Sequence, residues 1–317
     1  MLEADSHAGP AGRALPGVPG PATAPAGSPT APGPAAGRGM IGLVLTDLAP
    51  RVGVEPFFIE LVSGMEEALA PAGATVLLLV VHDLAAELAT YARWAAEGTV
   101  DAVVVVNLVH DDVRPVRLTR LGLPAVLAGR YAGPAALSSV VSDNAGAISA
   151  AMRLLRDLGH RRIGRVSGPA ELVHTAERSA TMLACGQRLR VDVRIAEADY
   201  SAEAGVRAAR RLLAEADPPT AIVFDNDVMA VAAEEELVRS GVGVPARVSL
   251  LACDDSTLCE LAVPPMSALN IDVHEHGGTL GRAVLDVLRG GRRRVYPGPP
   301  VRIRRRGSTG PAPADRP

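Results

Sequence analysis

The sequence predicts an α/β fold with two parallel β-sheets, each covered by helices and following one another along the chain. Short apolar runs alternate with helical patterns from residue 40 to about residue 307. These runs are nearly continuous in Val, Leu and Ile, which is typical of parallel strands buried on both faces. The alternation starts again near residue 161. This restart indicates two α/β halves with a cleft between them.

Composition favours a soluble intracellular protein. The chain has 317 residues, 48% of them hydrophobic, and a formal net charge of −3. That length allows two domains, and the acidic balance gives no sign of a basic nucleic-acid-binding surface. Three cysteines without metal-ligand or disulfide spacing predict no metal site and a reducing compartment. No secretory signal or membrane-span pattern is present in the sequence. We therefore expect a cytoplasmic protein without a cofactor.

Residues 1–39 are dominated by Ala, Gly and Pro and are expected to be disordered. They offer no apolar core for a helix-turn-helix. In the first half, strands are predicted at 41–48, 74–81, 101–108, 124–129 and 139–142, and helices at 56–69, 85–97 and 144–158. In the second half, strands are predicted at 161–168, 191–199, 221–224, 248–255, 267–272 and 301–307, and helices at 175–188, 202–214 and 275–288, with a further helix following Asp227.

The sharpest motif is TAIVFDNDVMAVAAEEELVRSG at residues 220–241, where a short apolar strand ends in three polar residues. Such a junction lies at the carboxyl end of a parallel strand, where these folds bind ligands. Asp227 is predicted to be the N-cap of the following helix, because its carboxylate can accept the first-turn N–H groups. Asp225 and Asn226 would then face the crevice. The alternative is that all three only cap the helix and form the turn.

An ordered set of motifs resembles the effector-binding core of the LacI/GalR family of bacterial transcription regulators. The matching strings are IGLVLTDL, EPFFIELVSGMEEAL, VDAVVVV, LGLPAVLAGR, VSDNAGA, LRDLGHRRIGRVSGP, DYSAEAG, PPTAIVFDNDVMA, VPARVSLLACDDS and PPMSALNID, with RGSTG as the ending. The resemblance covers residues 41–310. It implies a periplasmic-binding-protein-like fold, with two Rossmann-like subdomains joined by three crossovers around a small ligand. It also implies a homodimer formed through the first subdomain.

The resemblance implies the following limits. Residues 1–39 would be the disordered segment, 40–160 plus 273–294 the N-terminal subdomain, 161–272 plus 295–310 the C-terminal subdomain, and 311–317 a tail. The crossovers would lie near 159–162, 271–273 and 294–299. Family members bind operator DNA through a helix-turn-helix headpiece, which residues 1–39 do not resemble. Binding of operator DNA is therefore expected only if a headpiece lies upstream.

Several residues are candidates for effector binding. Phe57 is rotated by about 100° from the predicted core stripe that contains Phe58, so Phe57 can face the cleft while Phe58 packs inward. Both could instead lie in the core. Arg178 stands where the family often places a ligand-contacting arginine, and its guanidinium suits paired hydroxyls. The alternative is a solvated helix arginine. Thr181 and Met182 replace the glycine and aromatic residue usual in the family.

Three further positions follow strands or precede helices. Asp254 ends the strand VSLLACDD, and the resemblance implies that it accepts hydrogen bonds from ligand hydroxyls. The alternative is a general acid/base or metal-binding role, but no nucleophile or histidine set accompanies Asp254 and Asp255. His174, in the loop before Arg178, is a candidate effector contact. Asp143 is predicted to be an N-cap, with a cleft contact as the minority alternative.

These observations predict that the chain is a ligand-sensing transcription regulator, which binds a carbohydrate-like or nucleoside-like effector and is not an enzyme. Two alternatives share the fold: a solute-binding protein for transport, which would require export, and a headless cytoplasmic sensor. A dinucleotide-dependent enzyme is disfavoured because no GxGxxG motif follows the first strand. No catalytic residue is predicted.

Overall fold

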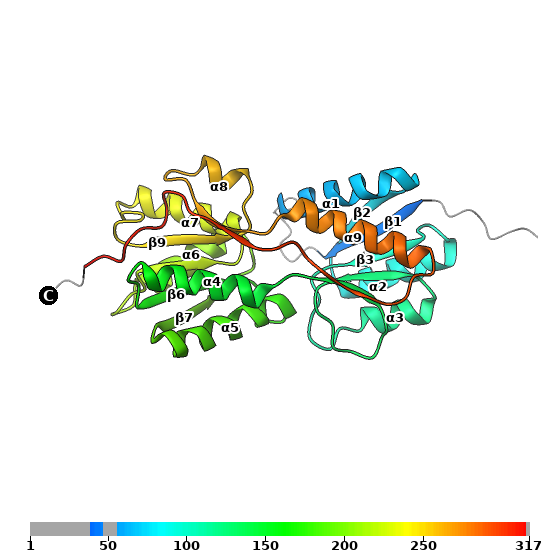
Figure 1. The fold of residues 1–317 in the computed structure, drawn as a ribbon, viewed down its shortest axis with the longest axis horizontal. Helices are drawn as coiled ribbons and strands as arrows, with labels where there is room; N and C mark the ends of the chain where they lie inside the picture. The colour runs from blue at the N-terminus through cyan, green and yellow to red at the C-terminus, as the bar shows by residue number, and fades with distance from the viewer. Residues whose placement is uncertain (1–38, 47–55, 315–317) are drawn as a thin grey trace, which may run out of the picture. The chain divides into compact units, whose positions relative to one another are not determined.

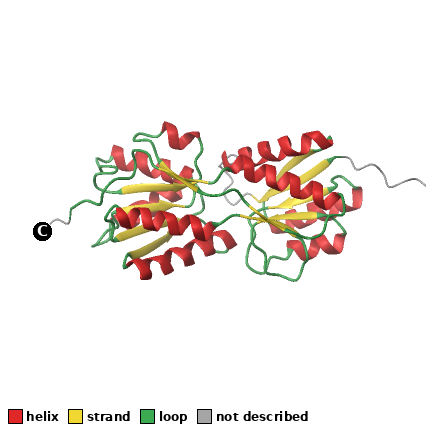
Figure 2. Cartoon of the chain, in the orientation of Figure 1, coloured by secondary structure: helices red, strands yellow, loops and turns green. Residues whose placement is uncertain are grey.

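A computed structural model describes residues 39–46 and 56–314, so the disorder expected for residues 1–38 lies outside the described residues. Two six-stranded sheets organise these residues (Figures 1 and 2). The first sheet has the order β11-β5-β4-β3-β1-β2, with β1 (Met40–Thr46), β2 (Thr75–Val81), β3 (Ala102–Val105), β4 (Ala125–Ala128), β5 (Ser138–Val141) and β11 (Val295–Pro297). All its strand pairs are parallel.

The second sheet repeats this plan. Its order is β12-β10-β9-β8-β6-β7, with β6 (Arg162–Ser167), β7 (Asp192–Glu197), β8 (Ala221–Phe224), β9 (Ser249–Cys253), β10 (Ser267–Asn270) and β12 (Arg302–Arg304). Among the described strand pairs of this sheet, only β12 with β10 is antiparallel. The sequence prediction of an α/β fold with two parallel sheets is confirmed.

Helices lie on both faces of each sheet (Figure 2). They are α1 (Pro56–Leu69), α2 (Leu84–Glu97), α3 (Arg114–Leu121), α4 (Asn144–Asp157), α5 (Val173–Leu189), α6 (Ala202–Leu213), α7 (Asp227–Arg239), α8 (Thr257–Leu261) and α9 (Val273–Leu288), with a 3₁₀ turn at Ala70–Ala72. Four buried apolar clusters fill the spaces between helices and sheets. The continuous Val/Leu runs of the strands are therefore buried on both faces, as the sequence predicted. None of the helices in the described ranges is long and apolar enough to cross a membrane.

Helices α1 and α9 lie side by side although more than 200 residues separate them in the chain (Figure 1). Glycines make this close approach possible. A Cβ atom on Gly64 would lie 1.9 Å from the backbone oxygen of His274, and one on Gly277 would lie 2.1 Å from that of Leu61. Because backbone atoms cannot retreat as a flexible side chain can, these positions require glycine. The packing fixes the start of α9 against α1.

Two of the expected subdomain limits need correction. Helix α4 was assigned with the first sheet, but its buried residues Ile148, Met152 and Leu155 pack in one cluster with Ile163 of β6. The chain therefore passes to the second sheet between β5 and α4, before the crossover predicted near 159–162. Residues 295–297 were assigned to the second subdomain, but as β11 they pair with β5 of the first sheet. The crossover near 271–273 lies between β10 and α9, and the other limits stay predictions.

Candidate functional site

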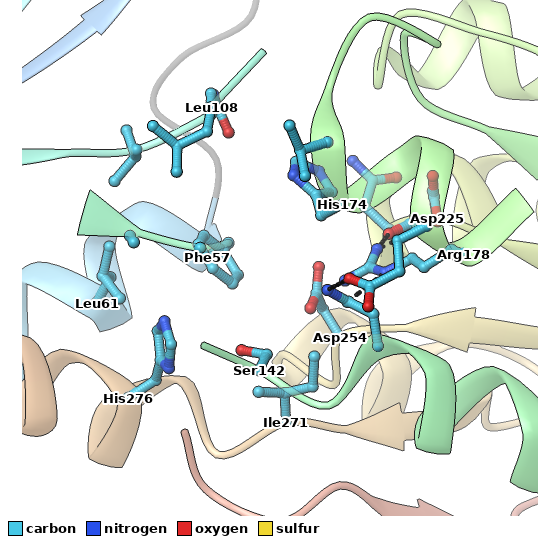
Figure 3. Close-up of a pocket in the computed structure, with 18 of the residues that line it drawn as sticks. Phe57, Leu61, Leu108, Ser142, His174, Arg178, Asp225, Asp254, Ile271 and His276 are labelled. Atoms are coloured by element: carbon cyan, nitrogen blue, oxygen red, sulfur yellow. Dashed lines mark hydrogen bonds and ion pairs between the residues drawn. The ribbon is translucent and has the colours of Figure 1, made fainter. Parts of the chain in front are cut away.

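One cavity of about 130 Å³ opens where the carboxyl ends of strands from both sheets meet. Its lining includes residues that follow β3, β4, β8, β9 and β10, together with the first turns of α1 and α5 (Figure 3). Ligands of open parallel sheets bind at this edge because the strand-to-helix loops present polar groups there. A water molecule needs about 10–15 Å³ of such space, so roughly ten water-sized atoms fit.

All seven predicted effector-binding residues line this cavity. They are Phe57, Phe58, His174, Arg178, Asp225, Asn226 and Asp254. Both phenylalanines are half-buried and pack edge to face, with ring centroids 5.3 Å apart. The expected division into one core ring and one cleft ring is wrong, since both contact the apolar core and both line the cavity. The first turn of α1 therefore brings two adjacent rings to the cavity.

Asp225 is the centre of a buried ion cluster. Its two carboxylate oxygens each accept a hydrogen bond of 2.8 Å from Nη2 of Arg165, and one also accepts from the backbone N–H of Gly168 at 2.9 Å. Nη1 of Arg178 donates to the other oxygen at 3.1 Å (Figure 3). Burial alone would raise the pKa of Asp225, but Coulomb attraction to Arg165 and Arg178 outweighs burial and holds the pKa below its ordinary value. Asp225 lines the cavity, as expected, and its carboxylate also holds two arginines.

Arg178 is buried, so the alternative of a solvated helix arginine is wrong. Its Nε donates to Oδ1 of Asn144 at 2.8 Å, and Nη1 donates to Asp225. Burial would lower the pKa of Arg178, but nearby acidic groups, including Asp225 and Asp254, reverse this effect and raise it. Within the described residues Nη2 has no hydrogen-bond partner. The guanidinium is therefore held in a fixed orientation with one donor group left at the cavity.

The N-cap of α7 is Asn226, and the predicted cap Asp227 is wrong. Asn226 has an extended backbone (φ −142°), and its Oδ1 accepts from the backbone N–H of Met229 at 2.9 Å. Asp227 already belongs to the helix, where a carboxylate favours the positive N-terminus. Its Oδ2 accepts from the backbone N–H of Ser256 at 2.9 Å and so ties α7 to the start of α8. Asp143 caps α4 by accepting from the N–H of Gly146 at 2.8 Å.

His174 and Tyr200 form a second polar group on the second-sheet side of the cavity. Nε2 of His174 lies 2.9 Å from the hydroxyl of Tyr200, which is also 3.0 Å from Oγ1 of Thr175. Burial and the positive charge of Arg178 lower the pKa of His174 to about 4, so its ring is neutral at pH 7. A neutral imidazole and a phenol can each donate or accept, which suits the hydroxyls of a polar ligand.

Backbone strain also gathers at the cavity. Five non-glycine residues of the described ranges have positive φ, and three of them line the cavity: Asn107 (φ 50°), Tyr200 (φ 69°) and Asp254 (φ 68°). Positive φ is costly for a side chain as large as tyrosine and persists where surrounding contacts enforce it. The strained backbone positions and the polar side chains therefore lie at the same cavity.

Sequence reasoning missed several cavity residues, notably Asn107, Ser142, Tyr200 and His276. Asn107 follows the run DAVVVV, so the signal that identified Asp225 and Asp254 could have identified it too. Tyr200 lies in the DYSAEAG string but carries no pattern of its own. His276 lies within a helix, and no local signal points to it.

Comparisons with known proteins agree with this geometry. A family model described as periplasmic binding protein-like domain matches residues 152–309. The HTH-type transcriptional regulator CelR of Thermobifida fusca is 31% identical over 256 residues, which cover 79% of this chain and 75% of CelR. The HTH-type transcriptional repressor CytR of Escherichia coli is 29% identical and covers 74% of this chain and 70% of its own length.

Solved structures give the same result. A LacI family transcriptional regulator from Bifidobacterium animalis superposes with a TM-score of 0.79 at 32% identity, covering 86% of this chain and 98% of that one. The transcriptional regulator CelR in complex with cellobiose superposes with a TM-score of 0.77 at 29% identity, covering 86% of this chain and 84% of CelR. The chain thus belongs to the LacI family of transcription regulators, which are not enzymes.

Proposed function

We propose that this chain senses a small hydroxyl-rich molecule, of the carbohydrate or nucleoside kind, in the cavity between its two sheets, and that this effector modulates DNA binding by a cytoplasmic homodimer. A solved structure of the transcriptional regulator CelR is a complex with cellobiose, which supports a sugar-like effector for this chain. Operator DNA would be bound by a headpiece, which the described residues do not include.

The observation that carries this proposal is the contrast between the two sides of the cavity. The second-sheet side presents the polar groups of Arg178, Asp254, His174 and Tyr200. The first-sheet side is mostly apolar and includes the two half-buried phenylalanine rings of α1. Sugars and nucleosides combine hydroxyls on their edges with an apolar face, so both sides of the cavity find a partner on one ligand.

The formal charges at the cavity favour a neutral ligand. Among the described residues, the positive charges of Arg165 and Arg178 are balanced by the carboxylates of Asp225 and Asp254. Arg130 at the rim is paired with Glu177 at 3.8 Å. A phosphorylated or carboxylated ligand would bring an uncompensated charge into a largely buried site, which is costly.

Effector binding would favour the arrangement in which the two sides of the cavity approach each other. Segments following β3 and β6 already pair across it: the N–H of Val173 donates to the oxygen of Leu108 at 2.8 Å, and Val109 forms an antiparallel bridge with Leu172. A ligand that contacts both sides binds this arrangement better than a more open one. The ligand therefore shifts the equilibrium between the two arrangements by its difference in affinity for them.

A thermal-shift screen against neutral sugars and nucleosides tests the proposal. A ligand at one hundred times its dissociation constant stabilises the folded state by about 2.7 kcal/mol. Probes that raise the melting temperature of the wild type should not raise that of Arg178→Leu or of Asp254→Asn. The exposed residues Arg282 and Asp217 supply matched controls, Arg282→Leu and Asp217→Asn, which should keep the shift. Equal shifts in the cavity variants and the controls would refute effector binding at this site.

The regulatory part has its own test. Duplex DNA selected from a random pool on the full-length protein should change affinity when an effector identified in the screen is added. Sedimentation should give a dimer at micromolar concentration. Unchanged DNA affinity, or a monomer only, would contradict the corresponding part of the proposal.

A further inference from the structure

His276 is a polar side chain on a mostly apolar part of the cavity wall, which also carries the hydroxyl of Ser142. It lies in the first turn of α9, is 6% exposed and lines the cavity below the α1 residues Phe57 and Leu61 (Figure 3). Arg178 and Asp254 lie on the other side of the cavity in the same view. A ligand that spans the cavity therefore meets polar groups at both ends.

The imidazole of His276 is unsatisfied in the described structure. Nδ1 is sealed from solvent and has no hydrogen-bond partner among the described residues. His160 shows how this chain satisfies a structural histidine: it is fully buried, Nδ1 lies 2.9 Å from Oγ1 of Thr220, and Nε2 lies 3.1 Å from the oxygen of Gly310. Buried polar atoms in native proteins are nearly always paired, and an exception requires an explanation.

The surroundings of the ring fix where its proton lies. Burial lowers the pKa of His276 to about 4, so the ring is neutral at pH 7 and carries one N–H. Nδ1 packs against the chain at Gly298, where an added Cβ would lie 3.1 Å from it. A proton on Nδ1 would create a buried donor without an acceptor, which is rarer in proteins than an under-used acceptor. The favoured tautomer therefore carries its proton on Nε2, the nitrogen that is not sealed in this way.

We infer that His276 is a specificity-determining residue of the effector site and that its Nε2–H donates a hydrogen bond to an oxygen of the ligand. This inference rests on the proposed function of the cavity. The ligand class narrows to neutral molecules with a hydroxyl, ring or carbonyl oxygen at the α9 end and hydroxyls at the Arg178 end. A ligand with an ammonium group at the α9 end is rejected, because its donors would meet the Nε2 donor.

Because the ligand would meet Nε2, Nδ1 has no partner among the described residues with or without a ligand, and it gives the ligand-free fold no stabilising hydrogen bond. An unpartnered buried polar atom destabilises the folded protein, whereas an apolar ring of similar shape does not. A residue kept for binding should therefore lower the stability of the ligand-free protein. A histidine kept for structure should raise it. The two roles of His276 thus predict opposite effects of the same substitution.

The test combines the tautomer, the ligand-free stability and ligand binding. In ¹⁵N NMR of the wild-type chain at pH 7, the His276 signals, assigned by their loss in His276→Phe, should show a neutral ring protonated on Nε2. His276→Phe and His276→Leu should each raise the melting temperature of the ligand-free protein, by about 2 °C or more. The matched control is His274→Phe on the same helix, because His274 is half-exposed, pairs with Glu60 and Glu67 and is not part of the cavity lining.

Any of the probes cellobiose, glucose, ribose, adenosine and cytidine that stabilises the wild type is then titrated calorimetrically. His276→Phe should weaken binding about tenfold or more, and His274→Phe should leave it unchanged. A ring protonated on Nδ1, or a lower melting temperature in both His276 variants, overturns the inference. Retained affinity in His276→Phe for every bound probe overturns it too, while sparing the proposed function. If no probe binds, the proposed function fails, and the tautomer and stability still decide the role of His276.

Discussion

Replacing Asp225 by asparagine removes the one charge that two buried arginines share. Asparagine keeps the size of the side chain and one oxygen, so the packing around it is conserved. Arg165 has a fully buried side chain, and that of Arg178 is 11% exposed, so neither guanidinium can recover its charge solvation from water. Removal of one partner from a buried ion pair costs about 3–5 kcal/mol. We expect Asp225→Asn to lower the free energy of unfolding by that amount at pH 7.

A second substitution tests the cause of this loss. Nε and Nη1 of Arg165 have no hydrogen-bond partner within the part of the chain that the structure describes, so Arg165 depends on Asp225. Arg165→Met in the Asp225→Asn background removes the stranded charge and keeps an apolar side chain. The double variant should therefore be more stable than Asp225→Asn alone, which is the mark of coupling between neighbouring residues.

Urea unfolding followed by far-UV circular dichroism measures both effects, with Asp217→Asn as the exposed control. Because the pKa of Asp225 lies below its ordinary value, the carboxylate stabilises the fold above about pH 4 and loses this effect as it is protonated at lower pH. The deficit of Asp225→Asn should thus be constant from pH 7 to pH 5. A deficit below about 1 kcal/mol, or a double variant less stable than Asp225→Asn, would refute the role given to this cluster.

Three further substitutions have defined outcomes. The pKa of His276 is lowered to about 4 in the folded protein, against about 6.5 unfolded, so burial of the ring adds no protonation cost above pH 6.5 and destabilises the fold increasingly as pH falls toward 4. Between pH 7 and pH 4.5, the unfolding free energy measured in urea should fall by about 2–3 kcal/mol more for wild type than for His276→Phe. An equal fall in the two proteins would contradict this expectation. Asn107→Val should lower the unfolding free energy by about 1–2 kcal/mol because of its positive φ, and Asn107→Gly should not. Equal effects of the two changes in thermal melts would show that the backbone there is not strained. Gly277→Ala should lower the unfolding free energy by about 3 kcal/mol or more, because the added Cβ would clash with the backbone oxygen of Leu61. A melting temperature close to that of wild type would mean that α1 and α9 can move apart.

The cavity residues that follow a strand could be predicted, because the pattern that identifies them lies in a few consecutive residues. An apolar run that stops at an acidic residue identifies the carboxyl end of a strand, and this placed Asp225 and Asp254 at the cavity. The partner of Asp225 could not be predicted in this way, because Arg165 lies 60 residues earlier inside a strand. Hydrogen bonds over that sequence distance depend on the register of β6 beside β8, which no local pattern encodes.

Other differences have similar causes. The stripe of α4 shows which face is apolar but not which sheet will bury it, so the first crossover was placed too late. Asn226 and Asp227 are both good capping residues, and only the extended backbone of Asn226 decides between them. His276 lies in a helix, where spacing indicates a face and not the absence of a hydrogen-bond partner.

Binding at the cavity is tested most directly by the thermal-shift screen of neutral sugars and nucleosides on wild type and Asp254→Asn in parallel, with Asp217→Asn as control. The expected result is at least one probe that stabilises wild type and the control in proportion to its concentration and leaves Asp254→Asn unchanged. Probes that stabilise all three proteins equally, or no stabilising probe at all, would contradict an effector site in this cavity.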